Sequence, residues 1–352
     1  MTGAGPVSPG IEWSDPSWYP ADLDIRGDRL AMLHIDRRVV EESTFMDTRI
    51  AADLRQSIAV DAAAVPGGPA GIPPVAWLFH TSFCCSTLLA KALHDHPQTV
   101  VYREPLVLRR LADARHEGRA LGHWPVTCTN LLARPWTPGG RVIIKPTHAS
   151  LNIAQALMNA TPDSRALVLT SSLQDFLVSN IKKTAETQAR IPALVEMALT
   201  AGEFHRRLPP QALSPPSLIA AAGLQWAAQR ELLLDIAEQS GSNRVAVLDA
   251  EWLLADIDDA VNRAQAWWGL VADPKRRGAR LAEVAHRHAK LGTREYGPQA
   301  RAHEVALVSR LHAPTLQAAN DWLQQHVLPA MRQEAVVLPA GQWSLTRLFD
   351  EQ

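Results

Sequence analysis

The sequence predicts an α/β protein in which helices cover both faces of a parallel sheet. Short apolar runs bounded by polar or Pro residues recur between residues 75 and 270, and each run precedes a stretch with helical spacing. At one such junction, residues 78–89, small polar residues separate a buried run from a helix. Strands covered on both faces appear as continuous apolar runs, and their alternation with helices indicates a parallel, doubly wound sheet.

Five runs are expected to form the core strands: 75–80, 99–102, 141–144, 165–170 and 244–249. Each is rich in Val, Ile or Leu. The chain between residues 172 and 238 is expected to be mostly helical, with a Pro-rich break at 208–216. Ligands of such sheets bind beyond the carboxyl ends of the strands, so the functional site is expected there.

The predicted domain organisation has three parts: an N-terminal accessory segment and linker (1–74), the α/β core (75–270) and a helical C-terminal extension packed on the core (271–352). Residues 29–39 alternate in places as a short strand does, and 63–74 are rich in Pro, Gly and Ala, as linkers are. Residues 302–331 form a long helical pattern interrupted at Pro314.

The composition is that of a globular protein: 352 residues, 47% hydrophobic, 20% charged and a net charge of −1. This balance predicts neither a nucleic-acid nor a membrane partner. Three cysteines without framework spacing indicate a reducing compartment, and no signal peptide or membrane span is evident, so a cytoplasmic location is expected. No Cys/His cluster has zinc-ligand spacing, so no metal is expected. The sequence pattern predicts no particular oligomeric state.

The junction after the first core strand is expected to form a phosphate loop. Its residues are Thr81, Ser82, Phe83, Cys84, Cys85, Ser86 and Thr87, with a helix opening at Ser86. A tight turn into a helix points backbone N–H groups and the positive end of the helix dipole at one spot, where an anion binds. The loop is not a Walker A motif, because it lacks the glycines and no Lys precedes Ser86. The alternative is an ordinary turn with a Ser helix cap.

This stretch resembles the P-loop sulfotransferases, in which T-x-[RK]-[ST]-G-[ST]-T-L-L binds the 5′-phosphosulfate of 3′-phosphoadenosine 5′-phosphosulfate. Thr81–Leu89 aligns with that motif without a gap. Residues 165–179 resemble the family's strand, turn and helix that hold the 3′-phosphate, with Ser171 in the turn and Ser179 as the phosphate-binding serine. The resemblance covers residues 75–270 and implies a P-loop NTPase-like fold.

The resemblance also suggests catalytic residues at the ends of two further strands. Lys145-Pro146-Thr147-His148 is similar to the K-T-H sequence of cytosolic members, in which the His is the base, and Pro146 is an insertion. Glu104 follows the second strand, where many members carry an acidic residue near the acceptor. His148 is therefore the first candidate base and Glu104 the second, with Lys145 as an accompanying cation.

Three departures from the family pattern concern the donor. Phe83 stands where the family has a Lys or Arg, Cys85 replaces the loop glycine, and Ser171 replaces the Arg that contacts the 3′-phosphate. Lys91 lies one helical turn beyond Thr87 and is expected to contribute to donor binding. Other basic residues that could substitute for the missing cations are Arg103, Lys145, Lys182 and Lys183.

The sequence thus predicts a sulfotransferase that uses 3′-phosphoadenosine 5′-phosphosulfate and acts on a hydroxyl or amine of a small-molecule or peptide acceptor. Two alternatives remain open, since a fold does not fix a function. One is a kinase-like nucleotide-dependent phosphotransferase, against which the missing Walker Lys counts. The other is a catalytically impaired nucleotide-binding protein, which Phe83 and Ser171 favour.

Overall fold

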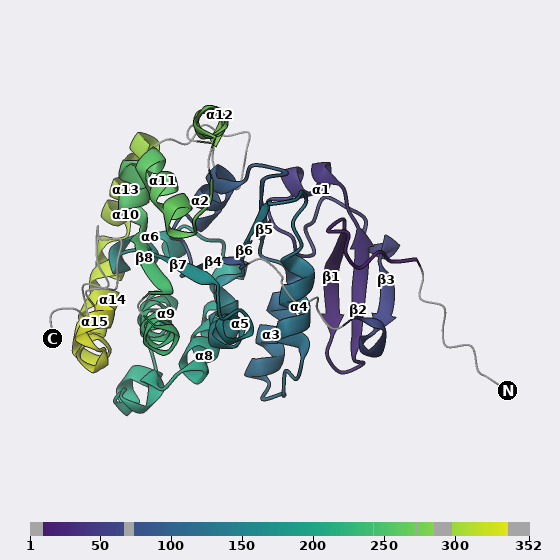
Figure 1. Ribbon diagram of the computed structural model, residues 1–352. Helices are drawn as coiled ribbons and strands as arrows, with labels where there is room; N and C mark the ends of the chain where they lie inside the picture. Colours follow the sequence, from purple (N-terminus) through teal and green to yellow (C-terminus); the bar gives the residue numbers. More distant parts are fainter. Residues whose placement is uncertain (1–9, 67–73, 242, 272, 285–297, 337–352) are drawn as a thin grey trace. The chain divides into compact units, whose positions relative to one another are not determined.

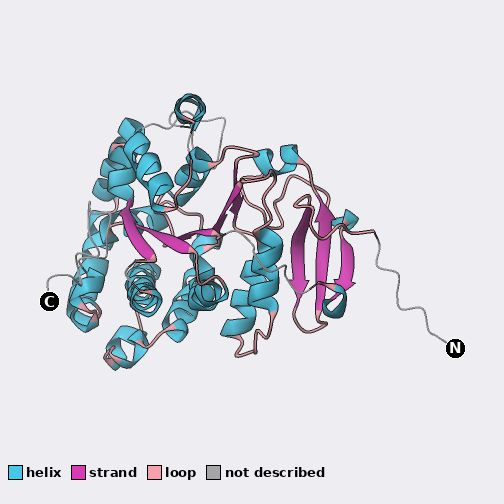
Figure 2. Ribbon diagram, viewed as in Figure 1, coloured by secondary structure: helices cyan, strands magenta, loops and turns pink. Residues whose placement is uncertain are grey.

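The computed structural model describes residues 10–66, 74–241, 243–271, 273–284 and 298–336. It is a mixed α/β structure with a five-stranded parallel sheet flanked by helices, and a separate three-stranded sheet near the N-terminus (Figures 1 and 2). The strand order of the larger sheet is β5-β6-β4-β7-β8. Its strands are β4 (Ala76–His80), β5 (Thr99–Arg103), β6 (Arg141–Lys145), β7 (Arg165–Thr170) and β8 (Val245–Asp249).

These five strands confirm the five apolar runs, each within one residue of the expected bounds. Every residue of β4, β5 and β8 is buried, which is why these runs carry no polar alternation. The pairs β5–β6 and β7–β8 are parallel. The first core strand, β4, lies in the middle of the order with later strands on both sides, so the loop after β4 occupies a topological switch point.

Contacts along the chain divide it into two compact units. The first contains residues up to 76 together with 94–164. Its elements, besides β5 and β6, are β1 (Trp18–Asp24), β2 (Arg29–His34), α1 (Arg37–Glu42), η1 (Leu54–Gln56), β3 (Ile58–Asp61), η2 (Ala62–Ala64), α3 (Leu106–His116), α4 (Trp124–Leu132), η3 (His148–Ile153) and α5 (Ala154–Ala160).

An antiparallel sheet, β1-β2-β3, occupies the N-terminal part of this unit. The strand expected within residues 29–39 is its central strand β2, whereas β1 and β3 were not expected. The linker expected at 63–74 falls partly on residues 67–73, outside the described residues. The predicted domain boundaries stay a prediction.

The second unit contains residues 77–93 and the chain from 165 onward. Its elements, besides β4, β7 and β8, are α2 (Ser86–Leu93), α6 (Leu173–Ile181), α7 (Ala185–Gln188), α8 (Ile191–Ala201), η4 (Phe204–Arg206), η5 (Pro210–Leu213), α9 (Leu218–Ser240), α10 (Ala250–Ala255), α11 (Ile257–Trp267), α12 (Pro274–Val284), α13 (Pro298–Leu311), α14 (Ala313–His326), η6 (Leu328–Ala330) and α15 (Gln333–Val336). The described part of 271–352 contains helices α12 to α15; α13 ends at Leu311, and Pro314 lies in the first turn of α14.

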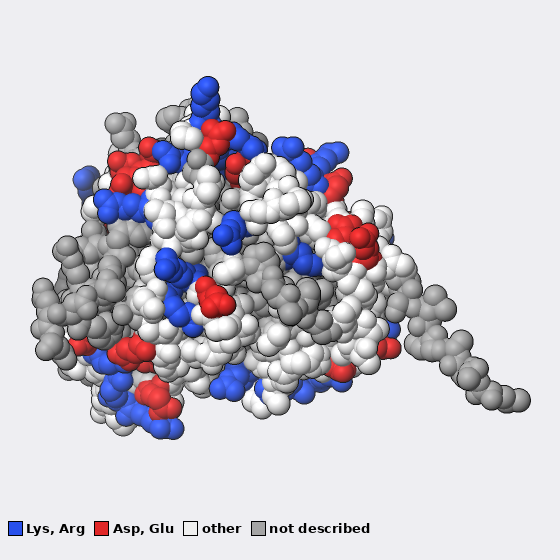
Figure 3. All heavy atoms as spheres, viewed as in Figure 1, with Lys and Arg blue, Asp and Glu red and all other residues white. Residues whose placement is uncertain are grey.

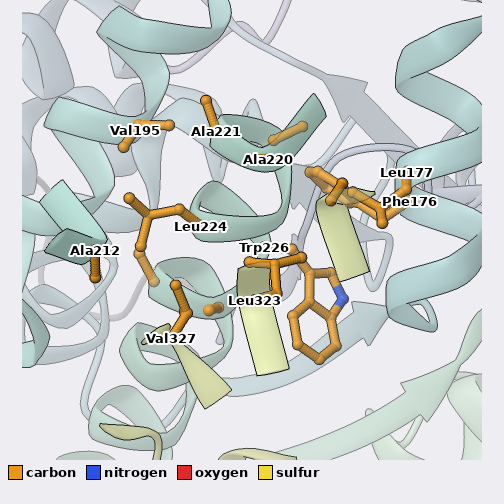
Figure 4. Packing of buried hydrophobic residues seen from close by; sticks show 14 of the residues in the cluster. Phe176, Leu177, Val195, Ala212, Ala220, Ala221, Leu224, Trp226, Leu323 and Val327 are labelled. Atoms are coloured by element: carbon orange, nitrogen blue, oxygen red, sulfur yellow. The ribbon is translucent and has the colours of Figure 1, made fainter. Parts of the chain in front are cut away.

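The core of this unit is built around α9, a 23-residue helix that is buried along most of its length. Phe176 and Leu177 of α6, Val195 of α8 and Leu323 of α14 pack against it (Figure 4). A helix with apolar residues on every side needs cover on every side, and α6, α8, α14 and α15 supply that cover.

Gly223 allows α9 and α14 to approach closely. A Cβ at this position would lie 2.2 Å from Cδ1 of the fully buried Leu323. Gly223→Ala is expected to gain about 1 kcal/mol of helix propensity and to lose up to about 3 kcal/mol to overpacking against the fully buried Leu323, so we expect a net destabilisation of up to about 2 kcal/mol. Urea denaturation measures it.

A matched variant tests the cause. In a Leu323→Ala background the added methyl group has room, so Gly223→Ala should there be neutral or stabilising. An equal loss in both backgrounds would contradict the clash.

Among the described residues, no helix combines the length and the apolar character required to traverse a bilayer. On the face shown in Figure 3, basic and acidic side chains are interspersed.

Candidate functional site

The predicted phosphate loop connects β4, which ends at His80, to α2, which begins at Ser86 as expected. The N–H of Thr81 donates to the carbonyl of Leu169 in β7 at 3.0 Å, which fixes the start of the loop to the neighbouring strand. The Thr81 carbonyl accepts from the Cys84 thiol at 3.0 Å, so the turn is closed from within. The start of the loop is therefore fixed to β7, and an internal hydrogen bond between Cys84 and Thr81 closes the turn.

Four backbone N–H groups of the loop remain without an acceptor among the described residues: those of Ser82, Phe83, Ser86 and Thr87. The hydroxyls of Ser86 and Thr87 also form no hydrogen bond to a described residue, although both side chains are buried. Buried amides at a helix start are satisfied by side chains, water or a ligand. The loop therefore presents a set of donors rather than an ordinary Ser cap, in which the side chain would accept from an amide.

The backbone conformation of the loop also favours anion binding. Phe83 and Cys85 have φ values of 60° and 64°, in the left-handed region that suits glycine. Left-handed residues within a turn direct successive N–H groups to one side and form an anion-binding concavity. Cys85 adopts this conformation at a cost of about 1–2 kcal/mol for its Cβ.

Two buried hydroxyls beside the loop have no hydrogen-bond partner among the described residues. They are Oγ1 of Thr81, the first loop residue, and Oγ of Ser171, directly after β7; both side chains are fully buried. An unpaired buried hydroxyl costs about 1–3 kcal/mol. Water or an oxygen-rich ligand would satisfy both groups, so the residues present fit a phosphorylated or sulfated group.

The turn after β7 leads into α6. The Ser172 hydroxyl caps this helix by accepting from the N–H of Asp175 at 3.2 Å. Ser179, the expected phosphate-binding serine, lies half-buried on α6, and its hydroxyl has no partner among the described residues. The carbonyl of Ser171 accepts from the indole of Trp226 at 2.9 Å, which ties the turn to α9.

The basic substitutes named from the sequence have different positions. The Lys183 ammonium lies 5.0 Å from the centroid of the Phe83 ring, so a cation is present beside this loop residue. Lys182 pairs with Glu304 of α13 at 2.8 Å. Arg103 donates to carbonyls at the end of α1, including that of Ser43, so it stabilises that helix end. Lys91 is half-buried on α2.

A residue that sequence reasoning missed also lies at the loop. Arg301 of α13 donates from Nη1 to Cys85 Sγ at 3.1 Å and from Nη2 to Asp175 Oδ2 at 3.3 Å. The only sequence signal was its place in the extension predicted to pack on the core; no local motif marks it.

A buried guanidinium lies at the carboxyl end of β7. Arg230 of α9 donates to Thr170 Oγ1 at 3.2 Å and to the carbonyls of Ala335 and Val336. Burial lowers the pKa of Arg230 to about 10, although Asp249 opposes the shift. Burial also raises the pKa of Asp249, which ends β8, and the charge of Asp175 contributes. Both groups thus experience a poorly solvated environment.

The first unit holds the predicted catalytic residues. Lys145, at the end of β6, is 1% exposed and its Nζ lies 2.7 Å from Oε1 of Glu104, whose side chain is 15% exposed. The N–H of Glu104 donates to the Lys145 carbonyl at 2.7 Å. Glu104 has a φ of 59°, so its carboxylate is held on a strained backbone. Such strain is found preferentially at functional sites.

His148 begins the 3₁₀ helix η3, three residues after the end of β6, and is half-buried. The structure thus groups the loop, Ser171 and Ser179 within the second unit, and Glu104, Lys145 and His148 within the first. Of the four non-glycine residues with positive φ among the described residues, three are Phe83, Cys85 and Glu104 of the predicted site.

The described residues contain no group of three or more His, Cys, Asp or Glu side chains placed to hold a metal ion.

Comparisons with known proteins yield structural similarity only. No family model and no curated protein sequence matches the chain. Among solved structures, it is similar to the sulfotransferase domain from the curacin biosynthetic pathway, with 12% identity, a TM-score of 0.41 and coverage of 68% of this chain and 91% of that one.

Two further structures of the same kind are similar. For the sulfotransferase from Alicyclobacillus acidocaldarius the identity is 16% and the TM-score 0.36, over 68% of this chain and 95% of that one. For the sulfotransferase domain of the Synechococcus PCC 7002 olefin synthase they are 15% and 0.39, over 77% and 95%.

Proposed function

We propose that this protein is a sulfotransferase that moves a sulfuryl group from 3′-phosphoadenosine 5′-phosphosulfate to a hydroxyl or amine of a small-molecule or peptide acceptor, in the cytoplasm and without a metal ion. The observation that carries the proposal is the donor-rich loop: unpaired amides of Ser86 and Thr87 at the start of α2, next to left-handed Phe83 and Cys85. The order of family motifs along the chain supports the choice of sulfuryl over other anionic groups.

In this proposal the loop residues Thr81–Thr87, with Lys91, bind the 5′-phosphosulfate, and Ser171 and Ser179 bind the 3′-phosphate. In the donor, the bond between sulfur and the bridging phosphate oxygen breaks as the sulfuryl group is transferred. The loop amides stabilise the charge that develops on the leaving phosphate oxygen as that bond breaks, because fixed dipoles need no reorganisation at that moment.

Glu104 or His148 accepts the proton of the acceptor hydroxyl or amine as the new bond to sulfur forms. A carboxylate needs no prior deprotonation at neutral pH, and an imidazole titrates near it, so both side chains can act as a base. Lys145 holds the Glu104 carboxylate at 2.7 Å and thereby restricts its orientation. The strained backbone of Glu104 supports its inclusion.

The nucleotide specificity of the loop gives a direct test. The bisphosphate product, 3′,5′-adenosine bisphosphate, is expected to raise the melting temperature of the native protein, since a ligand of the folded state stabilises it by mass action. ATP with magnesium should have little effect, because no Lys precedes Ser86. Stabilisation by magnesium ATP alone would favour a phosphotransferase, and no response to either would sink the proposal.

Thr87→Ala and Ser179→Ala are each expected to weaken bisphosphate binding about tenfold, because each removes a hydrogen bond to a charged oxygen. Isothermal titration calorimetry measures the affinity. Thr200→Ala is the matched control: Thr200 is exposed on α8 and its hydroxyl donates to the Glu196 carbonyl, so its loss should leave affinity unchanged. Unchanged affinity in both site variants would mean that the donor site is misplaced.

A further inference from the structure

Helix α13 brings a guanidinium to the phosphate loop from a distant part of the chain. Arg301 and Cys85 are 216 residues apart in sequence, yet Nη1 of Arg301 lies 3.1 Å from Sγ of Cys85. Cys85 directly precedes Ser86, whose amide has no acceptor among the described residues. The Arg301 guanidinium therefore contacts the residue next to the unpaired amide of Ser86.

Asp175 fixes the orientation of this guanidinium. Its Oδ2 accepts from Nη2 of Arg301 at 3.3 Å, and both side chains are largely buried. Asp175 is in the first turn of α6, where its carboxylate also interacts favourably with the helix dipole. The fork of Arg301 is thus held between α6 and the loop rather than left to solvent.

A purely structural role would be to hold α13 on α6, and the chain offers a comparison. A second ion pair, Lys182–Glu304 at 2.8 Å, also joins these two helices. The Lys182 ammonium pairs with Glu304, whereas Arg301 contacts the loop directly at Cys85. Attachment of the helices thus does not require a guanidinium at Cys85.

The loop itself carries no basic side chain between Thr81 and Thr87. Position 83, a Lys or Arg in the resembled family, is Phe83, whose ring packs edge-on against Phe176. A planar guanidinium with several fixed donors suits phosphate and sulfate oxygens better than a single ammonium does. Arg301 can therefore contribute positive charge that the loop's own sequence lacks.

We propose that Arg301 is a donor-binding residue: its guanidinium, oriented by Asp175, contacts the phosphosulfate end of the donor held by the loop. This inference rests on the proposed function. It makes α13, which lies beyond the segment that resembles the family, a part of the binding site.

The test compares bisphosphate affinity in four proteins: wild type, Arg301→Gln, Arg301→Lys and the matched control Lys182→Gln. Arg301→Gln is expected to weaken the affinity about tenfold or more, a change that corresponds to about 1.4 kcal/mol or more. Arg301→Lys, which keeps the charge and loses the fork, should be intermediate. Lys182→Gln should stay within about twofold, since the Lys182 ammonium is paired with Glu304 and not with a loop residue.

A second measurement does not depend on the nucleotide. Cys85 is the only partly exposed cysteine of the three, all of which are described. Alkylation by N-ethylmaleimide, followed by peptide mass spectrometry, therefore reports on the loop. Inorganic pyrophosphate should slow Cys85 alkylation in the wild type, and the ratio of rates without and with pyrophosphate should fall towards one in Arg301→Gln.

The inference is overturned if Arg301→Gln binds the bisphosphate as the wild type does, if Lys182→Gln loses as much affinity as Arg301→Gln, or if pyrophosphate protects Cys85 equally in wild type and Arg301→Gln. The proposed function fails differently. Suppose that the wild type does not bind the bisphosphate, but that pyrophosphate protects Cys85 in the wild type and not in Arg301→Gln. This result would contradict the sulfotransferase assignment and support the anion-binding role of Arg301.

Discussion

Glu104→Gln is expected to lower the free energy of unfolding by about 3 kcal/mol, because it leaves a buried ammonium without its neutralising carboxylate. Lys145 is almost fully buried, and Glu104 is the one described side chain that pairs with it. The cost is much larger than for an exposed pair, where solvent screens the charge. Urea denaturation at neutral pH measures the change.

Replacing both partners separates the charge from the fold. In Glu104→Gln/Lys145→Met the unpaired cation is gone, so most of the lost stability should return. Lys145→Met alone should cost less than Glu104→Gln, since Glu104 is more exposed and can recruit water. A double variant no more stable than Glu104→Gln would show that the pair contributes through packing and not through charge.

The same variants identify the base. If Glu104 accepts the acceptor's proton, the double variant should regain stability and still turn over about 10²–10⁴ times more slowly. His148→Gln changes neither member of the Lys145–Glu104 pair, so its turnover tests the role of the imidazole. Transfer from a radiolabelled sulfuryl donor to a panel of hydroxyl and amine acceptors provides the rates. Retained turnover in the double variant would assign the base to His148.

The core strands could be predicted because burial on both faces leaves a local record. A run such as that of β4 has no polar position to interrupt it, and its five residues are all buried. The start of α2 at Ser86 was equally readable, since small polar residues mark the change from strand to helix. These features depend on neighbours in sequence, which is what a pattern records.

The N-terminal sheet left a weaker record. Strand β1 contains Pro20, and its register with β2 shifts between Pro20 and Asp22. A proline and a bulge are tolerated because β1 is an edge strand, but they remove the alternation by which a strand is recognised. Strand β3 has only four residues, too few for a periodicity to stand out.

Features of the candidate site that depend on residues adjacent in sequence could be predicted, whereas contacts between distant parts of the chain could not. The change from strand to helix between His80 and Ser86 was predicted from the sequence, and Cys85 was visible as a departure from the resembled motif. The sequence did not show that Cys85 keeps a left-handed backbone, because φ is set by the surrounding structure. Arg301 was missed because its contact with Cys85 comes from the packing of α13 on α6, which no motif encodes.

The second large effect expected is the loss of anion binding in Ser86→Asp without a loss of stability. A carboxylate at the first residue of α2 would itself accept from the unpaired amides and would be favoured by the helix dipole by about 0.3–1 kcal/mol. The same carboxylate would occupy the place of the donor's anionic oxygens and repel them. Bisphosphate should then produce no thermal shift at concentrations that saturate the wild type.

Ser86→Asn is the matched control, because it has nearly the same shape and no charge. It should bind the bisphosphate more weakly than the wild type but still measurably, with calorimetry giving both affinities. The stability of Ser86→Asp is the decisive quantity. A buried carboxylate without donors would cost several kcal/mol, so a stable Ser86→Asp requires that the amides around Ser86 and Thr87 converge on it. A strongly destabilised Ser86→Asp would contradict the geometry on which the anion site depends.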